Sequence, residues 1–340
     1  MSTDSTPPAA AQSGGTSADP GSGPSGAADA SSIRNVAVIG AGTIGASWAA
    51  LFLAHGLTVT LCDPASNAEA SARTLIGQAW PTLAALGVAR DDVPWHALRV
   101  GADLDAALAD ADFVQENAPE REDFKIDLFA RMDAAAPART ILASSTSGLI
   151  MSRLQSRCRH PGRCVIGHPF NPPHLIPLVE VVGGGQTSPD TIERAMAFYR
   201  RVGKYPIRIN KEVPGHVANR LQAAVWREAI HLAMENVASI ADIDAAMAQG
   251  PGLRWAVFGP HMTFHLGGGQ GGMGHFLDHL KGPVQSWWDD LGNARLDDAT
   301  RQTLIAGLEQ ESRGRTIDDL AGERDAALIR ILAAKKQAGV

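Results

Sequence analysis

With 340 residues, the chain is long enough for two domains that each bury a core. Hydrophobic residues make up 45% of the chain and charged residues 19%, which are ordinary values for a globular protein. The formal net charge of −6 excludes a strongly basic chain, so nothing favours a nucleic-acid partner. No apolar run approaches the roughly 18 residues of a membrane span, so we expect no membrane partner.

The first 32 residues are mostly Ser, Thr, Gly, Pro, Ala and Asp, and they predict a disordered tail. This segment lacks the basic start and apolar centre of a secretory signal. The three cysteines, Cys62, Cys158 and Cys164, form no CxxC pair. We therefore expect reduced thiols, no metal site and a cytoplasmic protein.

Regular structure is expected from Ile33 onward. Asn35–Ile39 is a short apolar run with β-branched residues, and a glycine-rich turn follows it directly. An apolar stretch over 46–54 and a second strand-like run over 57–63 come next. Strand, glycine turn, helix and strand together predict one βαβ unit.

The rest of the first half alternates between strand-like and helical segments. Helical stretches such as 123–135 and 189–201 separate most of the strand candidates, which are 98–101, 112–115, 140–144, 164–168, 178–182 and 207–209. This alternation predicts an α/β, Rossmann-type, doubly wound and mainly parallel sheet.

After residue 214 the strand-like runs stop. Helical patterns cover 217–237, 240–247, 300–310 and 317–336, and a glycine-rich patch over 267–274 is expected to be a flexible turn. We therefore expect a dinucleotide-binding domain over 33–212 and an all-α domain over 213–340.

The glycine turn has the GxGxxG spacing of a dinucleotide-binding loop. Gly40 permits the tight turn, Gly42 lets the backbone approach a pyrophosphate, and Gly45 lets the helix pack on the strand. Thr43 and Ile44 begin the helix, whose free N–H groups favour phosphate. A flavin site, a nucleotide-sugar site or a purely structural glycine turn are the alternatives.

Asp63 closes the second strand, 23 residues after Gly40. A carboxylate there can accept hydrogen bonds from the adenosine ribose and would repel a 2′-phosphate. No arginine follows until Arg73. The cofactor is therefore predicted to be NAD rather than NADP.

Polar residues follow two later strand candidates. Ser147 comes after the run at 140–144, and His168 ends the run at 164–168, with Glu180 twelve residues further on. The carboxyl ends of parallel strands face the ligand crevice. A histidine oriented by a carboxylate can remove a hydroxyl proton there, although a structural histidine is commoner.

The run GHPFNPPHLIPLVEVV around His168, and Lys211-Glu212-Val213-Pro214-Gly215 leading to Asn219-Arg220, carry a specific resemblance. The chain resembles the L-3-hydroxyacyl-CoA dehydrogenase superfamily from Val36 to the C-terminal helices. It is most similar to the carnitine dehydrogenase and the gulonate dehydrogenase/lambda-crystallin branches. Likeness to the carnitine branch lies in QAWPTL, QENAPER, GLRW and GGQGGM, at residues 78–83, 115–121, 252–255 and 268–273.

The resemblance implies roles for four residues. His168 would be the base in alcohol oxidation and the acid in ketone reduction. Glu180 would orient its imidazole. Ser147 and Asn219 would hydrogen-bond the reacting oxygen or the nicotinamide ribose.

The resemblance further implies that Glu116 lies beside the cofactor ribose and nicotinamide, and that Asn171 supports the histidine loop. Some positions depart from the pattern. His216 stands where relatives often carry Phe, Asn219 stands where carnitine enzymes can carry Asp, and 261–265 is unusually rich in histidine. These departures concern the substrate and leave the chemistry unchanged.

Basic residues are scarce where an acyl-CoA enzyme needs them. Segment 67–86 follows the second strand and has Arg73 as its only basic residue, which favours a small free hydroxy acid over a CoA ester. Arg254 could clamp a carboxylate, or form an interdomain salt bridge. Trp255 could contact a quaternary ammonium, or pack in a helical core.

Three functions remain open at this level. The first is an NAD-dependent dehydrogenase for a small L-3-hydroxy acid such as carnitine or a sugar acid. The second is a 3-hydroxyacyl-CoA dehydrogenase of fatty-acid metabolism, and the third a non-catalytic, crystallin-like protein. By analogy with relatives, we expect a homodimer joined through the helical domain.

Overall fold

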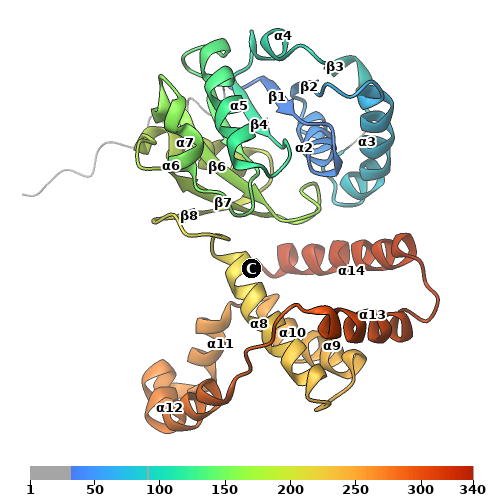
Figure 1. Cartoon of the computed structure of the whole chain (residues 1–340), viewed down its shortest axis with the longest axis vertical. Coiled ribbons are helices and arrows are strands. Elements are labelled where there is room, and N and C mark those ends of the chain that lie inside the picture. Colours follow the sequence, from blue (N-terminus) through green and yellow to red (C-terminus); the bar gives the residue numbers. More distant parts are fainter. Residues whose placement is uncertain (1–31, 90–91, 340) are drawn as a thin grey trace, which may run out of the picture.

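The computed structural model describes residues 32–89 and 92–339, and the expected disordered tail at 1–32 lies outside them except for Ser32. A sheet covered by helices forms one half of the molecule, and helices alone form the other (Figure 1). This arrangement confirms the predicted combination of a doubly wound α/β half and an all-α half.

Eight strands form one sheet in the order β3-β2-β1-β4-β5-β6-β7-β8. All neighbouring pairs are parallel except β6 and β7, which are antiparallel. The strands are β1 (Asn35–Ile39), β2 (Thr58–Cys62), β3 (Leu98–Gly101), β4 (Phe113–Glu116), β5 (Ile141–Ser144), β6 (Cys164–Pro169), β7 (Leu178–Gly183) and β8 (Tyr205–Ile209).

Helices cover both faces of the sheet, which explains why most residues of its strands are buried. One core contains the aromatic residues Trp48, Phe52, Phe198 and Tyr199, and the other contains Phe129 and its neighbours. The helices of this half are α2 (Thr43–Ala54), α3 (Ala68–Ala85), α4 (Leu104–Leu108), α5 (Glu122–Ala135), α6 (Met151–Leu154) and α7 (Pro189–Arg201).

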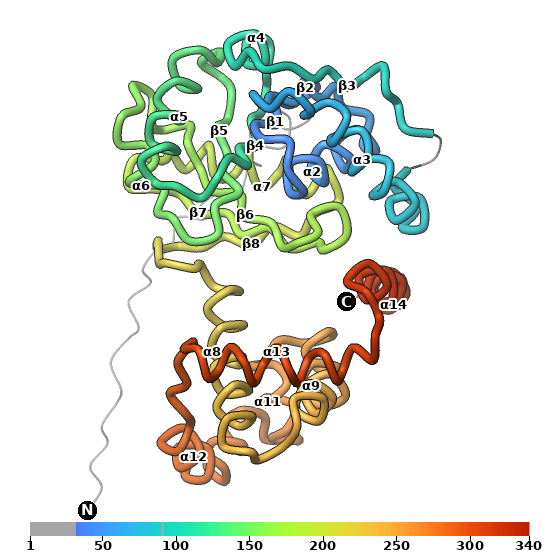
Figure 2. The backbone as a smooth tube through the Cα atoms, turned by 45° about the vertical axis from the view of Figure 1, so that its right-hand side comes forward, coloured from blue at the N-terminus to red at the C-terminus, as the bar shows by residue number. Residues whose placement is uncertain are grey.

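The second half begins where the chain leaves β8. Its long first helix leads away from the sheet, and its last helix runs back beside the sheet half, where it contacts α3 (Figure 2). The helices are α8 (Ala218–Met234), α9 (Ile240–Gln249), α10 (Pro251–Trp255), α11 (Pro260–Gly267), α12 (Gly272–Asp290), α13 (Asp298–Ser312) and α14 (Ile317–Ala338).

The glycine-rich patch at 267–274 differs from the expected flexible turn. It contains the end of α11, a short 3-10 turn and the start of α12, which begins at Gly272. Glycine and proline are poor helix formers, and Pro283 lies inside α12, so the sequence pattern concealed this helix. None of the helices in the described ranges is long and apolar enough to cross a membrane.

Candidate active site

A pocket of about 290 Å³ lies at the carboxyl ends of β5 and β6, beside the first turns of α8. Five of the residues expected at a cofactor or substrate site line it together: Ile44, Ser147, His168, Asn171 and Asn219. They come from α2, two strand-end loops, β6 and α8, so the fold gathers residues that are far apart in the sequence.

The pocket also includes residues that sequence reasoning missed. Ser145, Phe170 and Gln222 line it, and the Phe170 ring lies 5.5 Å from the ring of His168. Gln222 follows Asn219 by three residues on α8, so helical spacing places both on one face. That spacing could have identified Gln222 from the sequence.

The strand register sets His168 opposite Glu180. These residues pair directly across the antiparallel β6–β7 ladder, which places both side chains on the same face. His168 Nδ1 lies 2.9 Å from Glu180 Oε2, with 4% of His168 and none of Glu180 exposed. A carboxylate accepts only, so Nδ1 carries the hydrogen and Nε2 is the basic nitrogen.

The second carboxylate oxygen of Glu180 binds the helical half. Its Oε1 accepts the N–H groups of Val217 and Ala218 at the start of α8, both at 2.9 Å. Burial acts to raise the pKa of Glu180, but the hydrogen bonds from His168, Ala218 and Val217 outweigh burial and hold this pKa below its ordinary value. Glu180 is therefore a carboxylate at neutral pH.

The loop after β5 is held from two sides. Glu120 Oε1 accepts the Thr146 hydroxyl at 2.5 Å and the Ser147 N–H at 3.0 Å. From α8, the Asn219 amide donates to the Ser147 carbonyl at 3.3 Å. The Ser147 side chain is exposed and faces no protein partner in the described chain, which leaves its hydroxyl available to a ligand.

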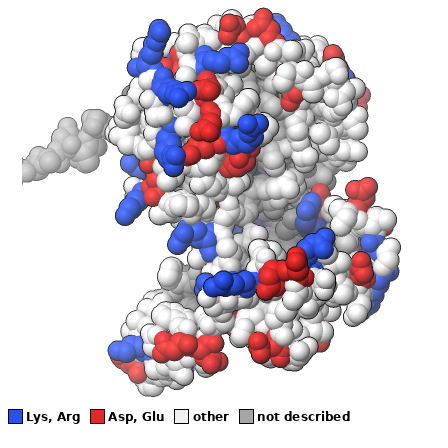
Figure 3. All heavy atoms as spheres, viewed as in Figure 1, with Lys and Arg blue, Asp and Glu red and all other residues white. Residues whose placement is uncertain are grey.

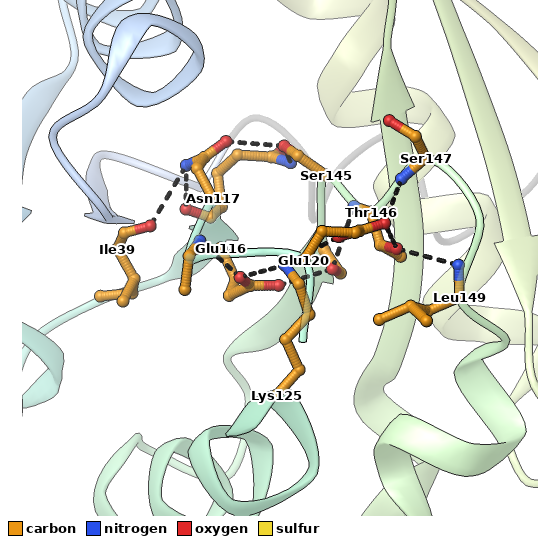
Figure 4. Close-up of polar contacts among 12 residues, drawn as sticks. Ile39, Glu116, Asn117, Glu120, Lys125, Ser145, Thr146, Ser147 and Leu149 are labelled. Carbon is orange, nitrogen blue, oxygen red and sulfur yellow. Dashed lines mark hydrogen bonds and ion pairs between the residues drawn. The ribbon is translucent and has the colours of Figure 1, made fainter. Parts of the chain in front are cut away.

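Glu116 lies deeper than the sequence suggested. It is fully buried, with Oε1 2.6 Å from Lys125 Nζ and from the Ala118 nitrogen, and Oε2 accepting the Ser144 hydroxyl at 2.5 Å. In this conformation it has no exposed surface to offer a cofactor. Figure 4 shows that these contacts instead brace the loop carrying Asn117 and Glu120.

The glycine loop fits a pyrophosphate. A Cβ at Gly42 would meet no atom within 4 Å, so the space above this residue is open. A Cβ at Gly45 would lie 1.9 Å from the Gly40 carbonyl oxygen. Gly40 itself has a φ of 97°, and a Cβ there would lie 2.7 Å from the Asn117 carbonyl oxygen. No side chain caps the start of α2, which leaves its first N–H groups free for an anion.

Asp63 lies next to this loop, as the ribose prediction requires. Its two carboxylate oxygens accept the N–H groups of Ala41 at 2.8 Å and of Ala65 at 2.9 Å. Each oxygen keeps a lone pair for a ribose hydroxyl. Asp63 thus connects the end of β2 to the glycine loop while it stays partly exposed.

Comparison with known proteins decides the family. The model of the 3-hydroxyacyl-CoA dehydrogenase NAD-binding domain matches residues 35–213, and that of the C-terminal domain matches 215–304. The chain belongs to the 3-hydroxyacyl-CoA dehydrogenase family. It is an NAD-dependent dehydrogenase, as the glycine loop and Asp63 indicated.

Individual members of the family are also similar. L-carnitine dehydrogenase of Streptomyces griseus is 51% identical over 302 residues, covering 89% of this chain and 90% of that protein. A crystal structure of 5-formyl-3-hydroxy-2-methylpyridine-4-carboxylic acid 5-dehydrogenase has 31% identity and a TM-score of 0.76, over 89% of this chain and 99% of the other. A crystal structure of (S)-3-hydroxybutyryl-CoA dehydrogenase of Ralstonia eutropha has 29% identity and a TM-score of 0.60, covering 65% of this chain and 78% of the other.

Arg254 and Trp255 do not reach the pocket of this dehydrogenase. Both end α10, and Arg254 is exposed beside a separate hollow of about 500 Å³ that Leu253, Val257 and Phe258 also line. The sequence indicated a cation and an aromatic ring in the helical half but gave no information on their distance from His168. Neither residue is among those that line the pocket at His168.

Proposed function

We propose that this dehydrogenase oxidises a small free L-3-hydroxy acid, with L-carnitine as the leading substrate. The observation that carries the proposal is the 51% identity to an L-carnitine dehydrogenase, which extends over both halves of the chain. Relatives from Streptomyces coelicolor and Pseudomonas aeruginosa with the same name are 48% and 42% identical over 90% of this chain.

The charges around α3 support a free acid rather than a CoA ester. Arg73 is the only basic residue on α3, and it already pairs with Glu69 at 2.8 Å and lies 5.0 Å above the Trp95 ring. CoA phosphates need several available cations. On the face shown in Figure 3, Lys and Arg alternate with Asp and Glu and form no continuous basic patch.

In the proposed reaction, His168 is the general base. Bound NAD⁺ supplies the acceptor for the hydride that leaves the substrate carbon. The His168 Nε2 takes the hydroxyl proton, so the alcohol becomes a ketone and the imidazole becomes an imidazolium. Glu180 stabilises that charge at Nδ1, while Ser147 and Asn219 are positioned to hydrogen-bond the reacting oxygen.

Two substitutions test this assignment. His168→Ala is expected to lower kcat roughly 10²–10⁴-fold, because no base remains to take the proton. Glu180→Gln should lower kcat by a factor in the same range. In this variant the backbone N–H groups of Val217 and Ala218 hold the amide oxygen. The amide NH₂ then faces His168 and forces its hydrogen onto Nε2.

Steady-state kinetics and NADH binding by fluorescence measure both effects. NADH affinity should be unchanged, and exposed His96→Ala serves as the matched control. Near-wild-type turnover of His168→Ala would eliminate the proposed base.

A substrate screen separates the three candidate functions. We expect NAD⁺ reduction with L-carnitine and little with 3-hydroxybutyryl-CoA, followed at 340 nm, the absorbance of NADH. Turnover with the CoA ester alone would show that the enzyme is a 3-hydroxyacyl-CoA dehydrogenase. Turnover with neither compound, in protein that binds NADH, would favour a non-catalytic role.

The Arg254 clamp stays a prediction. No Lys or Arg lines the catalytic pocket, so a carboxylate there lacks a cation within the described chain. Arg254 makes no ion pair with any described residue, and it lines a hollow separate from the catalytic pocket.

If Arg254 binds the carboxylate, Arg254→Met should raise KM for the acid at least ~10-fold, because the variant loses a charge-assisted hydrogen bond. Arg254→Lys should recover part of the effect. Unchanged KM in folded Arg254→Met would place carboxylate binding elsewhere.

We also propose a homodimer joined through the helical half, residues 213–340, with 33–212 holding the cofactor. Beyond residue 216, the buried hydrophobic residues in the described chain are Ile230 and Ala233. Large apolar side chains are instead exposed, including Leu253 at 61%, Trp287 at 63% and Trp288 at 64%. Helices without a core of their own need a partner surface.

Light scattering tests the dimer. The wild type should have twice the chain mass, and the double substitution Trp287→Glu/Trp288→Glu should shift it towards monomer, because two charges would enter an apolar interface. Tyr205→Glu, at an exposed aromatic residue of the sheet half, should leave the mass unchanged. A monomeric wild type at micromolar concentration would refute the proposal.

We propose that the enzyme works in the cytoplasm. Cys62, Cys158 and Cys164 are all free, although the sulfurs of Cys158 and Cys164 lie only 3.8 Å apart. Free thiols at this separation fit a reducing compartment.

A further inference from the structure

His216 occupies an unusual position at the junction of the two halves. Gly215 and His216 follow one another with φ of 75° and 51°, and the His216 N–H closes a tight turn onto the Val213 carbonyl at 3.1 Å. A left-handed conformation is unfavourable for a residue with a Cβ. Contacts of the His216 side chain must therefore stabilise this turn.

Those contacts are internal. Only 2% of His216 is exposed, and its Nε2 lies 3.1 Å from the Thr146 carbonyl oxygen, so Nε2 carries a hydrogen and donates. The ring centre lies 5.2 Å from that of His168, with the planes tilted by 51°. His216 thus joins the loop of Ser147 to the catalytic imidazole from behind the pocket.

The surroundings keep His216 neutral. Its Nδ1 is buried and has no hydrogen-bond partner among the described residues, so a second proton there would be unsatisfied. Burial and nearby His168 lower the pKa of His216, against the opposing effects of the Thr146 bond, Glu180 and Glu120. A neutral ring can pack beside an imidazolium at His168 without repelling it.

The two residues after His216 connect this turn to the catalytic pair. Val217 and Ala218 donate their N–H groups to Glu180 Oε1, and Glu180 Oε2 binds His168 Nδ1. Both N–H groups directly follow the left-handed turn, and the side chain of His216 ties that turn to the Thr146 carbonyl. We propose that His216 is a positioning residue, which holds Glu180 and His168 in the geometry for proton transfer. The proposal rests on the dehydrogenase function proposed above.

Two substitutions of similar length isolate the hydrogen bond. Gln at position 216 can present an amide N–H where Nε2 lies, whereas Met has nearly the same length and no donor. His216→Met should lower kcat on the order of 10- to 100-fold, the effect of a misplaced catalytic group. KM for the acid and NADH affinity should change less than ~3-fold, because His216 is neither in the glycine loop nor among the residues that line the pocket. His216→Gln should recover most of the kcat.

A third variant covers the case in which His216→Met does not fold. His216→Gly has no left-handed penalty, so it should fold with the turn intact. It removes the ring and the bond to Thr146 that tie this turn to the Ser147 loop, so kcat should fall as in the Met variant. Asn236→Gly is the matched control, because exposed Asn236 also has a left-handed φ, 55°, and lies just beyond the end of α8 that is remote from the pocket. It should keep wild-type kcat.

The proposal is overturned if His216→Gly turns over at the wild-type rate, or if the Gln and Met variants are equally impaired. An effect confined to melting temperature or NADH affinity would also overturn it, since that is the signature of a structural role. Every variant is assayed with both L-carnitine and 3-hydroxybutyryl-CoA. If wild type uses only the ester, the substrate proposal fails while the ratio of Gln to Met activity still tests His216.

Discussion

One carboxylate, Glu180, determines how the two halves of this enzyme work together. One of its oxygens orients His168 and the other accepts two N–H groups at the start of α8. Each hydrogen bond to a charged group contributes about 1.5–3 kcal/mol, and an unpaired buried carboxylate would cost more. The sheet half and the helical half therefore cannot separate at this point without exposing or unpairing Glu180. Because this carboxylate orients the base, the position of α8 and the direction of the imidazole are coupled.

A second buried carboxylate supports the cofactor side in the same way. Glu116 pairs with Lys125 at 2.6 Å in a region where neither side chain has more than 1% exposure. Removing one partner of such a pair is costly, typically about 3–5 kcal/mol, because it leaves an isolated buried charge. The pair fixes the loop after β4, and Glu120 at the end of that loop fixes the Ser147 segment. The loop after β4 and the Ser147 segment are thus both positioned by hydrogen bonds to carboxylates.

Much of this arrangement could be predicted from the sequence, and the failures have physical causes. Short apolar runs located the strands within about two residues, because these strands are buried on both faces. Helix α7 at Pro189–Arg201 was located in full, because its one buried face imposes a regular apolar pattern. Neither the sequence pattern nor the resemblance encodes burial depth or tertiary distance. Glu116 was therefore expected beside the cofactor ribose and Arg254 at the substrate carboxylate, whereas Glu116 is fully buried and Arg254 does not line the pocket. Glycine and proline concealed α12, whose stability depends on packing more than on helix propensity. Helical spacing from Asn219 could have identified Gln222, whereas the contacts of His216 with Thr146 and His168 became visible only once the two halves were placed together.

Glu180 makes Nε2 the basic nitrogen of His168, and the tautomer of this histidine can be observed directly. Long-range ¹H–¹⁵N correlation spectra of histidine-labelled enzyme, assigned by comparison with His168→Ala, distinguish the two neutral forms by their nitrogen shifts. The account predicts the Nδ1–H tautomer for His168 at neutral pH in the wild type. A wild-type His168 in the Nε2–H form would contradict the account, because the pocket would then face a nitrogen that cannot accept a proton.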